Sequence, residues 1–102
     1  MSERVLRLLG LGLRARSVVV GVTGTRAQLT AGKLACVVLA ADATARTLDK
    51  VDRPARARGI PVVQGPVSDR LGAALGRPPV QAVGVQDRAL ARGLVAAGGS
   101  EE

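Results

Sequence analysis

The sequence feature that most constrains the fold is the apolar run over residues 35–40, which contains no polar side chain. A strand with one face in water alternates apolar and polar residues, whereas an unbroken apolar run is typical of a strand covered on both faces. The run is also far shorter than the roughly 18 apolar residues of a membrane-spanning helix. It therefore predicts a central strand in a sheet that carries helices on both faces.

Helical and strand-like segments alternate on either side of this strand. Apolar spacing and capping residues predict helices over residues 3–15, 23–31, 45–58, 67–75 and 88–97, with Thr44 and Asp87 as N-caps of the third and fifth. Short apolar runs predict three more strands over residues 18–20, 60–63 and 80–85. Because Pro54 lacks an N–H, we expect the third helix to be split near Arg53. The order predicts an α/β fold in which a four-stranded sheet lies between two helical layers.

The chain is long enough for one domain only. It has 102 residues, with no repeat and no linker, so we expect a single domain over residues 1–97 and a flexible, Gly-rich tail over residues 98–102. No Phe, Tyr or Trp is present. The core must therefore be aliphatic and depend on many small contacts.

The charge is strongly positive. Fifteen basic residues, thirteen of them Arg, face eight acidic ones, which gives a formal net charge of +7. Residues 1–41 carry six basic side chains against Glu3 alone. Such an excess favours polyanionic partners. High Arg content also follows from codon usage in a GC-rich genome, and composition alone does not separate the two explanations.

Few residues are available for catalysis or metal binding. There is no His, and the single cysteine, Cys36, lies inside the central apolar run, where we expect a buried small side chain. The Asp residues stand at predicted helix ends or among basic residues, where capping and surface pairing account for them. A phosphate loop would need Gly and Ser or Thr where Ala27 and Leu34 stand. We therefore expect no enzymatic activity, no cofactor and no metal.

No segment of the sequence suggests a membrane or secretory destination. Every apolar run is about strand length, and the first residues lack the continuous apolar stretch and cleavage site of a signal peptide. The sequence thus predicts a cytoplasmic protein without a membrane partner.

One strand-to-helix turn is a candidate anion-binding site. Gly21, Thr23, Thr25 and Arg26 gather where the first strand passes into its helix. A helix N-terminus presents free N–H groups and partial positive charge, and a nearby Arg adds affinity for phosphate. The alternative interpretation is that Thr23 only caps the helix and that Arg26 is solvated.

Three stretches, in this order and spacing, are similar to the kink-turn RNA-binding ribosomal-protein family of the archaeal "L-seven-Ae" and eukaryotic "L-thirty-e" type, which includes bacterial YlxQ-like members. They are Leu8-Leu9-Gly10-Leu11, the run from Ala31-Gly32-Lys33 to Asp42-Ala43, and Ile60-Pro61-Val62 followed by Leu71-Gly72-Ala73-Ala74-Leu75-Gly76. The resemblance implies an L-thirty-e-like three-layer α-β-α sandwich with a central four-stranded mixed sheet.

The resemblance also implies where RNA would bind. The family grips a kinked RNA with the turn after the first strand and with a late loop, which here are residues 21–26 and 76–80. Where the family usually shows Asn, Glu and Lys, this sequence has Thr23, Gly24 and Ala27. Those family side chains read base edges, so affinity in this chain is expected to depend mainly on phosphates.

The sequence as a whole favours a non-enzymatic RNA-binding protein, associated with the ribosome or another ribonucleoprotein, that binds structured, kink-turn-like RNA. One alternative is a protein-interaction module on the same fold that has lost RNA specificity, and a second is a small nucleotide-binding enzyme. The predicted RNA contacts are Gly21, Thr23, Thr25, Arg26, Lys33, Thr44, Arg77, Pro79 and Val80.

Overall fold

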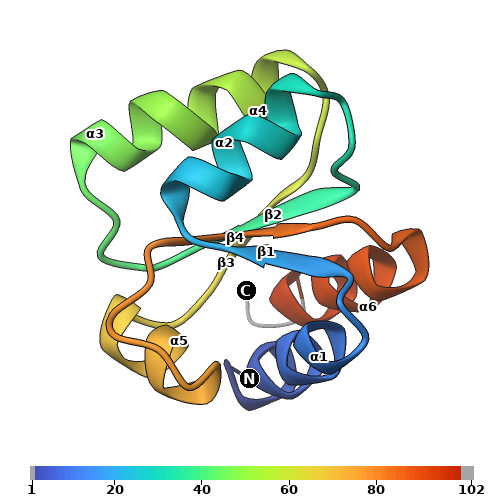
Figure 1. Cartoon of the computed structure of the whole chain (residues 1–102), viewed down its shortest axis with the longest axis vertical. Coiled ribbons are helices and arrows are strands. Elements are labelled where there is room, and N and C mark those ends of the chain that lie inside the picture. Colours follow the sequence, from blue (N-terminus) through green and yellow to red (C-terminus); the bar gives the residue numbers. More distant parts are fainter. Residues whose placement is uncertain (1, 100–102) are drawn as a thin grey trace.

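A computed structural model of the chain describes residues 2–99 and contains one four-stranded sheet between two layers of helices (Figure 1). The elements are α1 (Ser2–Arg14), β1 (Val18–Val20), α2 (Val22–Thr30), β2 (Cys36–Leu39), α3 (Ala45–Thr47), the π-helix η1 (Leu48–Asp52), α4 (Arg53–Ala57), β3 (Val62–Gln64), α5 (Ser68–Ala74), β4 (Ala82–Val85) and α6 (Arg88–Gly99). The predicted α-β-α sandwich is confirmed.

The sheet is mixed, with the strand order β1-β4-β2-β3. β2 pairs with β3 in parallel, while β4 lies between β1 and β2 and is antiparallel to both. Every residue of β2 and β4 is buried, as predicted for a strand that helices cover on both faces. The third strand begins two residues later than predicted because Pro61 has no N–H for the ladder.

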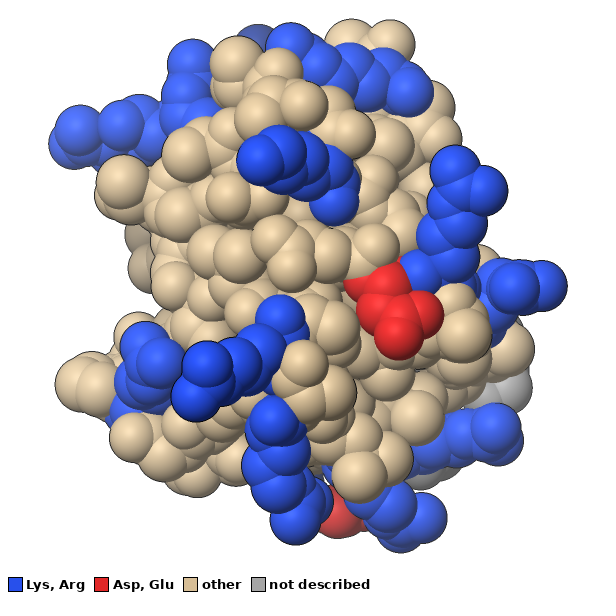
Figure 2. All heavy atoms as spheres, turned by 45° about the vertical axis from the view of Figure 1, so that its right-hand side comes forward, with Lys and Arg blue, Asp and Glu red and all other residues tan. Residues whose placement is uncertain are grey.

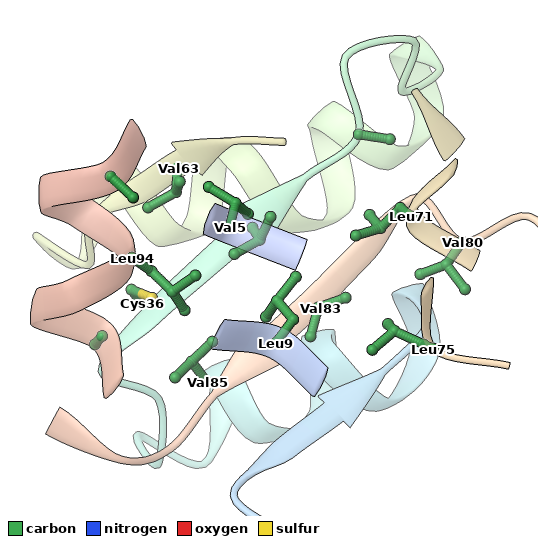
Figure 3. Close-up of a cluster of buried hydrophobic side chains, with 14 residues drawn as sticks. Val5, Leu9, Cys36, Val63, Leu71, Leu75, Val80, Val83, Val85 and Leu94 are labelled. Atoms are coloured by element: carbon green, nitrogen blue, oxygen red, sulfur yellow. The ribbon is translucent and has the colours of Figure 1, made fainter. Parts of the chain in front are cut away.

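The core is aliphatic on both faces of the sheet. On one face α1, α5 and α6 cover the strands, and Leu9, Leu71 and Leu94 meet Val83 and Val85 there (Figure 3). On the other face α2, η1 and α4 bury a smaller cluster, to which Leu29 and Val51 contribute. Because no ring fills space, the helices lie directly on Val, Leu and Ala side chains of the sheet.

Pro54 disturbs its helix at the predicted place but does not interrupt it. The chain is helical from Ala45 to Ala57, and it widens into the π-helix η1 before α4 begins at Arg53. Pro54 is the second residue of α4, and because it has no N–H the regular α-helical ladder cannot run through it; the wide turn of η1 directly precedes it. The predicted split is therefore a wide turn in one continuous rod.

The last helix starts as predicted and runs further than predicted. The carboxylate of Asp87 accepts hydrogen bonds from the N–H groups of Ala89 at 2.8 Å and Leu90 at 3.3 Å, which caps α6. Gly98 and Gly99, predicted to begin the tail, continue the helix. The rest of the predicted tail, residues 100–102, lies outside the described residues.

Within residues 2–99 no helix combines the length and the apolar character needed to cross a bilayer.

Cys36 is fully buried between the sheet and the α1/α6 layer, as the sequence predicted (Figure 3). Burial raises the pKa of the Cys36 thiol from its usual 9.0 to about 12. At pH 8 only about one thiol in ten thousand would then be ionised. We predict that a thiol-specific reagent added at pH 8 labels the unfolded chain quickly and the native chain only as fast as it unfolds. Equal labelling rates with and without denaturant would contradict the buried position.

Candidate RNA-binding site

Four loops meet at one end of the sheet, which we call the loop end. β1, β2 and β3 run in the same direction and β4 runs against them, so the carboxyl ends of the first three strands lie beside the start of β4. The pairs Val20 with Val83 and Leu39 with Ala82 fix this alignment. The loop end lies on the left of Figure 1, where α3 and α5 begin.

Backbone hydrogen bonds join these loops to one another. In each, an N–H of one loop reaches a carbonyl of a neighbouring segment over 2.9–3.1 Å. The pairs, donor first, are Gly21 to Ala82, Ala40 to Gln81, Ala41 to Pro66, and Val80 to Ser68. The loop end is therefore held in one arrangement without a ligand, which lowers the entropic cost of binding.

Gln81 connects the loop before β4 to the start of α3. Its side-chain oxygen accepts from the Thr47 hydroxyl at 2.7 Å and from the Thr44 N–H at 3.0 Å. The Thr44 hydroxyl in turn accepts from the Thr47 N–H at 3.2 Å and caps α3. Nothing in the sequence spacing marks Gln81 for this role, because 34 residues separate it from Thr47.

Asp42 performs a similar function between the loop after β2 and α5. Its carboxylate accepts from the Ser68 N–H at 2.8 Å and from the Ser68 hydroxyl at 3.0 Å. The hydrogen bond from the Ser68 N–H is the main cause that lowers the pKa of Asp42 below its usual 3.8, and the hydroxyl contributes in the same direction.

The turn from β1 into α2 differs in detail from the prediction. Gly21 is the N-cap and has a φ of +106°, which favours glycine, and it supplies no capping side chain. Thr23 is the second residue of the helix and is exposed, so the alternative interpretation, in which Thr23 only caps the helix, is wrong. Thr25 is a residue of α2 and is fully buried, with its hydroxyl 3.5 Å from the carbonyl oxygen of Val19 on β1. Its side chain supports the turn and is not available to a ligand.

Arg26 and Lys50 line a hollow of about 420 Å³ between α2 and η1. The Nη1 of Arg26 donates to the Lys50 carbonyl oxygen at 3.1 Å, which holds the guanidinium over the hollow. Thr23 lines the same hollow. The sequence identified Arg26 and Thr23 but not Lys50, which lies 24 residues further along the chain and reaches α2 only through the packing of η1.

The late loop keeps two of its three predicted contacts at the surface. Arg77 and Pro79 are exposed at the loop end, whereas Val80 is 7 % exposed and belongs to the core beside α5. Val80 is therefore not a free apolar wedge. Lys33 is exposed but follows the end of α2, and the neighbouring Ala35 bonds to the last residue of β4, at the opposite end of the sheet. The structure does not bring Lys33 together with the other predicted contacts.

Comparison with known proteins identifies the family. Residues 3–95 match the profile of the family described as "Ribosomal protein L7Ae/L30e/S12e/Gadd45 family". The chain belongs to this family. It is thus a member of the L7Ae family of kink-turn RNA-binding proteins, which are generally not enzymes. No match is found among curated protein sequences.

Two solved structures of L7Ae-like fold resemble the chain over nearly its whole length. A protein of unknown function from Bacillus halodurans is 31% identical, with a TM-score of 0.84, and the match covers 91% of this chain and 94% of that one. A 15.5kD RNA binding protein from Giardia lamblia is 20% identical, with a TM-score of 0.78, and the match covers 97% and 88%. The second likeness shows the shared fold.

The three positions at which the resemblance led us to expect Asn, Glu and Lys, now Thr23, Gly24 and Ala27, differ in the space around them. Thr23 and Ala27 are exposed on α2. Gly24, in contrast, is half-buried, and a Cβ added there would lie 2.6 Å from Cγ1 of Val19 on β1. α2 thus approaches the first strand so closely that a side chain at position 24 would require Val19 to shift. Within residues 2–99, no cluster of three or more His, Cys, Asp or Glu could hold a metal ion.

Removing the Gln81 side chain should destabilise the protein. Gln81→Ala leaves the buried Thr47 hydroxyl without its short hydrogen bond, at a cost of about 1–3 kcal/mol in the free energy of unfolding. Gln86→Ala is the matched control, since within residues 2–99 the exposed Gln86 side chain has the Gln28 side chain as its one hydrogen-bond partner, and the cost should stay below about 0.5 kcal/mol. Urea unfolding of both variants measures the difference. Equal costs would show that Gln81 does not organise the loop end.

The Asp42 contact should make stability depend on pH. Its folded-state pKa lies below the usual 3.8, so its contribution is complete above that value and is lost as the pH falls through the folded-state pKa. We expect Asp42→Ala to be less stable than wild type at pH 7 and the difference to shrink under strongly acidic conditions. Unfolding titrations at several pH values test this, and a constant difference would contradict it.

Proposed function

We propose that this protein binds structured RNA with a kink-turn-like bend through the loop end, without catalysing a reaction. The proposed contacts are Gly21, Thr23, Arg26, Thr44, Arg77 and Pro79, joined by Lys50 and by Arg46 at the start of α3. The observation that carries the proposal is a rigid group of loops with exposed basic side chains, in a member of an RNA-binding family.

The basic side chains at the loop end are available to phosphates. Among residues 2–99, none of Arg26, Arg46, Lys50 and Arg77 forms an ion pair; the ion pairs there join Arg53, Arg56 and Arg70 to Asp49, Asp52 and Glu3. Arg26 uses one of its N–H donors on the Lys50 carbonyl, and a guanidinium has five. Charge at this surface is therefore not neutralised from within the protein.

The backbone at the start of α2 supplies further donors. The first N–H groups of a helix have no intrahelical acceptor and carry partial positive charge. In α2 they follow Gly21, whose missing side chain lets a phosphate approach closely. Arg26 lies one turn further along α2. This combination suits a sugar–phosphate backbone better than a base edge.

We further propose that the protein is a bacterial YlxQ-like member of the family that works in the cytoplasm on ribosomal or other ribonucleoprotein RNA. The 31% identity to the Bacillus halodurans protein supports the bacterial affiliation. The family description, which names ribosomal proteins, supports the class of RNA.

A second candidate function is protein interaction on the same fold. The observation that favours it is Gly24, which replaces a base-reading side chain and has no room for one beside Val19. A pure interaction module would retain no RNA, whereas the RNA-binding function requires retention that depends on the loop end.

Binding should be electrostatic and confined to the loop end. If Arg26, Arg46, Lys50 and Arg77 each meet one phosphate, log affinity should fall against log salt with a slope of about −3, and Arg77→Ala should reduce the slope by about 0.7 and weaken binding by about 5- to 10-fold at low salt. Fluorescence anisotropy with a kink-turn RNA and a straight duplex of equal length measures both quantities.

Arg92→Ala is the matched control, because Arg92 is an exposed Arg on α6 at the opposite end of the sheet. It should change the slope far less than Arg77→Ala. A slope near zero, equal effects of the two variants, or no retention of either RNA would refute RNA binding through the loop end.

A further inference from the structure

A groove of about 730 Å³ runs along α6 at the end of the sheet opposite the loop end. α6 forms one wall, and the segments that lead into β2 and β3 form the other. Leu34, Ile60, Pro61, Ala91 and Val95 give this groove an aliphatic lining. We call it the α6 groove.

The α6 groove leaves apolar surface in water. Val95 is 41% exposed, although it lies on a helix whose neighbours Ala91 and Leu94 are buried. Past Pro61 and Val95 the surface continues into a second hollow of about 260 Å³ beside β3, which is an edge strand. The α6 groove itself is mainly apolar, whereas the second hollow also has the polar side chains of Arg56 and Gln64 in its lining. An exposed apolar groove that opens beside an edge strand is typical of a surface that binds a peptide segment.

Positive charge borders the α6 groove. Arg88 and Arg92 line it from the same face of α6, one turn apart, and both are exposed. Within residues 2–99 neither forms an ion pair, and like charges at this spacing repel weakly. Lys33, which is exposed, directly precedes Leu34 of the lining in the sequence. The nearby Asp87 uses its carboxylate to cap α6.

The face that includes this end of the molecule carries many more basic than acidic side chains. Figure 2, which brings forward the right-hand side of Figure 1, shows Lys and Arg around an uncharged area, with few Asp or Glu between them. A ligand that uses both the aliphatic lining and the positive border must present aliphatic groups to the lining. It must also present anionic groups to the guanidinium groups of Arg88 and Arg92.

RNA fits this combination less well than an acidic peptide. A sugar–phosphate backbone gains nothing from aliphatic surface, and the groove contains no aromatic ring on which a base could stack, since the chain has none. Carboxylates of Asp or Glu form bidentate pairs with Arg, and Leu or Val beside them can fill an aliphatic groove.

We propose that the α6 groove binds an acidic, aliphatic segment of a partner protein, with carboxylates on Arg88 and Arg92 and apolar side chains against Val95 and Ile60. This function goes beyond RNA binding and uses a different end of the molecule. The protein would then join an RNA, held at the loop end, to a protein partner held at the α6 groove.

Peptide selection tests the proposal without a known partner. Short random peptides displayed on phage are selected on the full chain and counter-selected on Arg88→Glu/Arg92→Glu. We expect the enriched peptides to combine Leu, Ile or Val with Asp or Glu, and synthetic copies to bind the double variant at least about tenfold more weakly than wild type. Copies with Lys in place of the acidic residues should bind the double variant better than wild type.

Val95→Ser provides a second, uncharged variant. Val95 is substantially exposed, so the substitution should leave the fold intact, which circular dichroism checks, and should weaken peptide binding without changing RNA affinity. No enrichment, or peptides that bind the double variant as well as wild type, would overturn the proposal. So would a loss of RNA affinity in the double variant as large as that in Arg77→Ala, which would make the groove a nucleic-acid contact. RNA binding by Arg77→Ala is measured separately, so either proposal can fail alone.

Discussion

The structure depends on two adjacent strands, β2 and β4, that are buried on both faces and paired along their whole length. Their eight residues are Cys, Val, Leu, Ala and Gly, so neither face carries a polar or bulky group that would hold a helical layer away. Because the chain has no aromatic side chain, each layer must lie close to the sheet to exclude water. The helices that cover the two faces of the sheet are positioned by this close contact.

The direction of the strands then separates the surface into two functional ends. Three strands finish at the loop end, where polar side chains such as Asp42 and Gln81 join loops that are distant in sequence. At the other end α2 finishes, α6 begins, and the chain enters β2 and β3. The nucleic acid and the polypeptide that we propose as ligands would therefore not compete for surface on this small domain.

Much of the fold was predictable because its signals are local. The apolar run around Cys36 predicted the central strand, Asp87 predicted the start of α6, and Pro54 predicted the place where the third helix changes its winding. The exact form of that change was not predictable, because a π-helix depends on how η1 packs against α2.

The site was less predictable because it depends on distant contacts. Lys33 was predicted to bind RNA together with Arg26, but α2 runs along the sheet, so its start and its end lie near opposite ends of the strands. Thr25 could have been recognised as buried, since Leu29 stands four residues later on the same face of the helix. Lys50 gave no signal at all, because only tertiary packing brings it to Arg26.

The contact between Gly24 and Val19 also limits how the protein can change. An acidic residue at position 24 would collide with the valine unless position 19 first became smaller. A side chain at position 24 is therefore linked to the size and orientation of the side chain at position 19, and a change at one position constrains the other. The exposed Arg and Lys side chains of this surface are under no such restriction, so its charge can be altered one residue at a time without repacking α2 on β1.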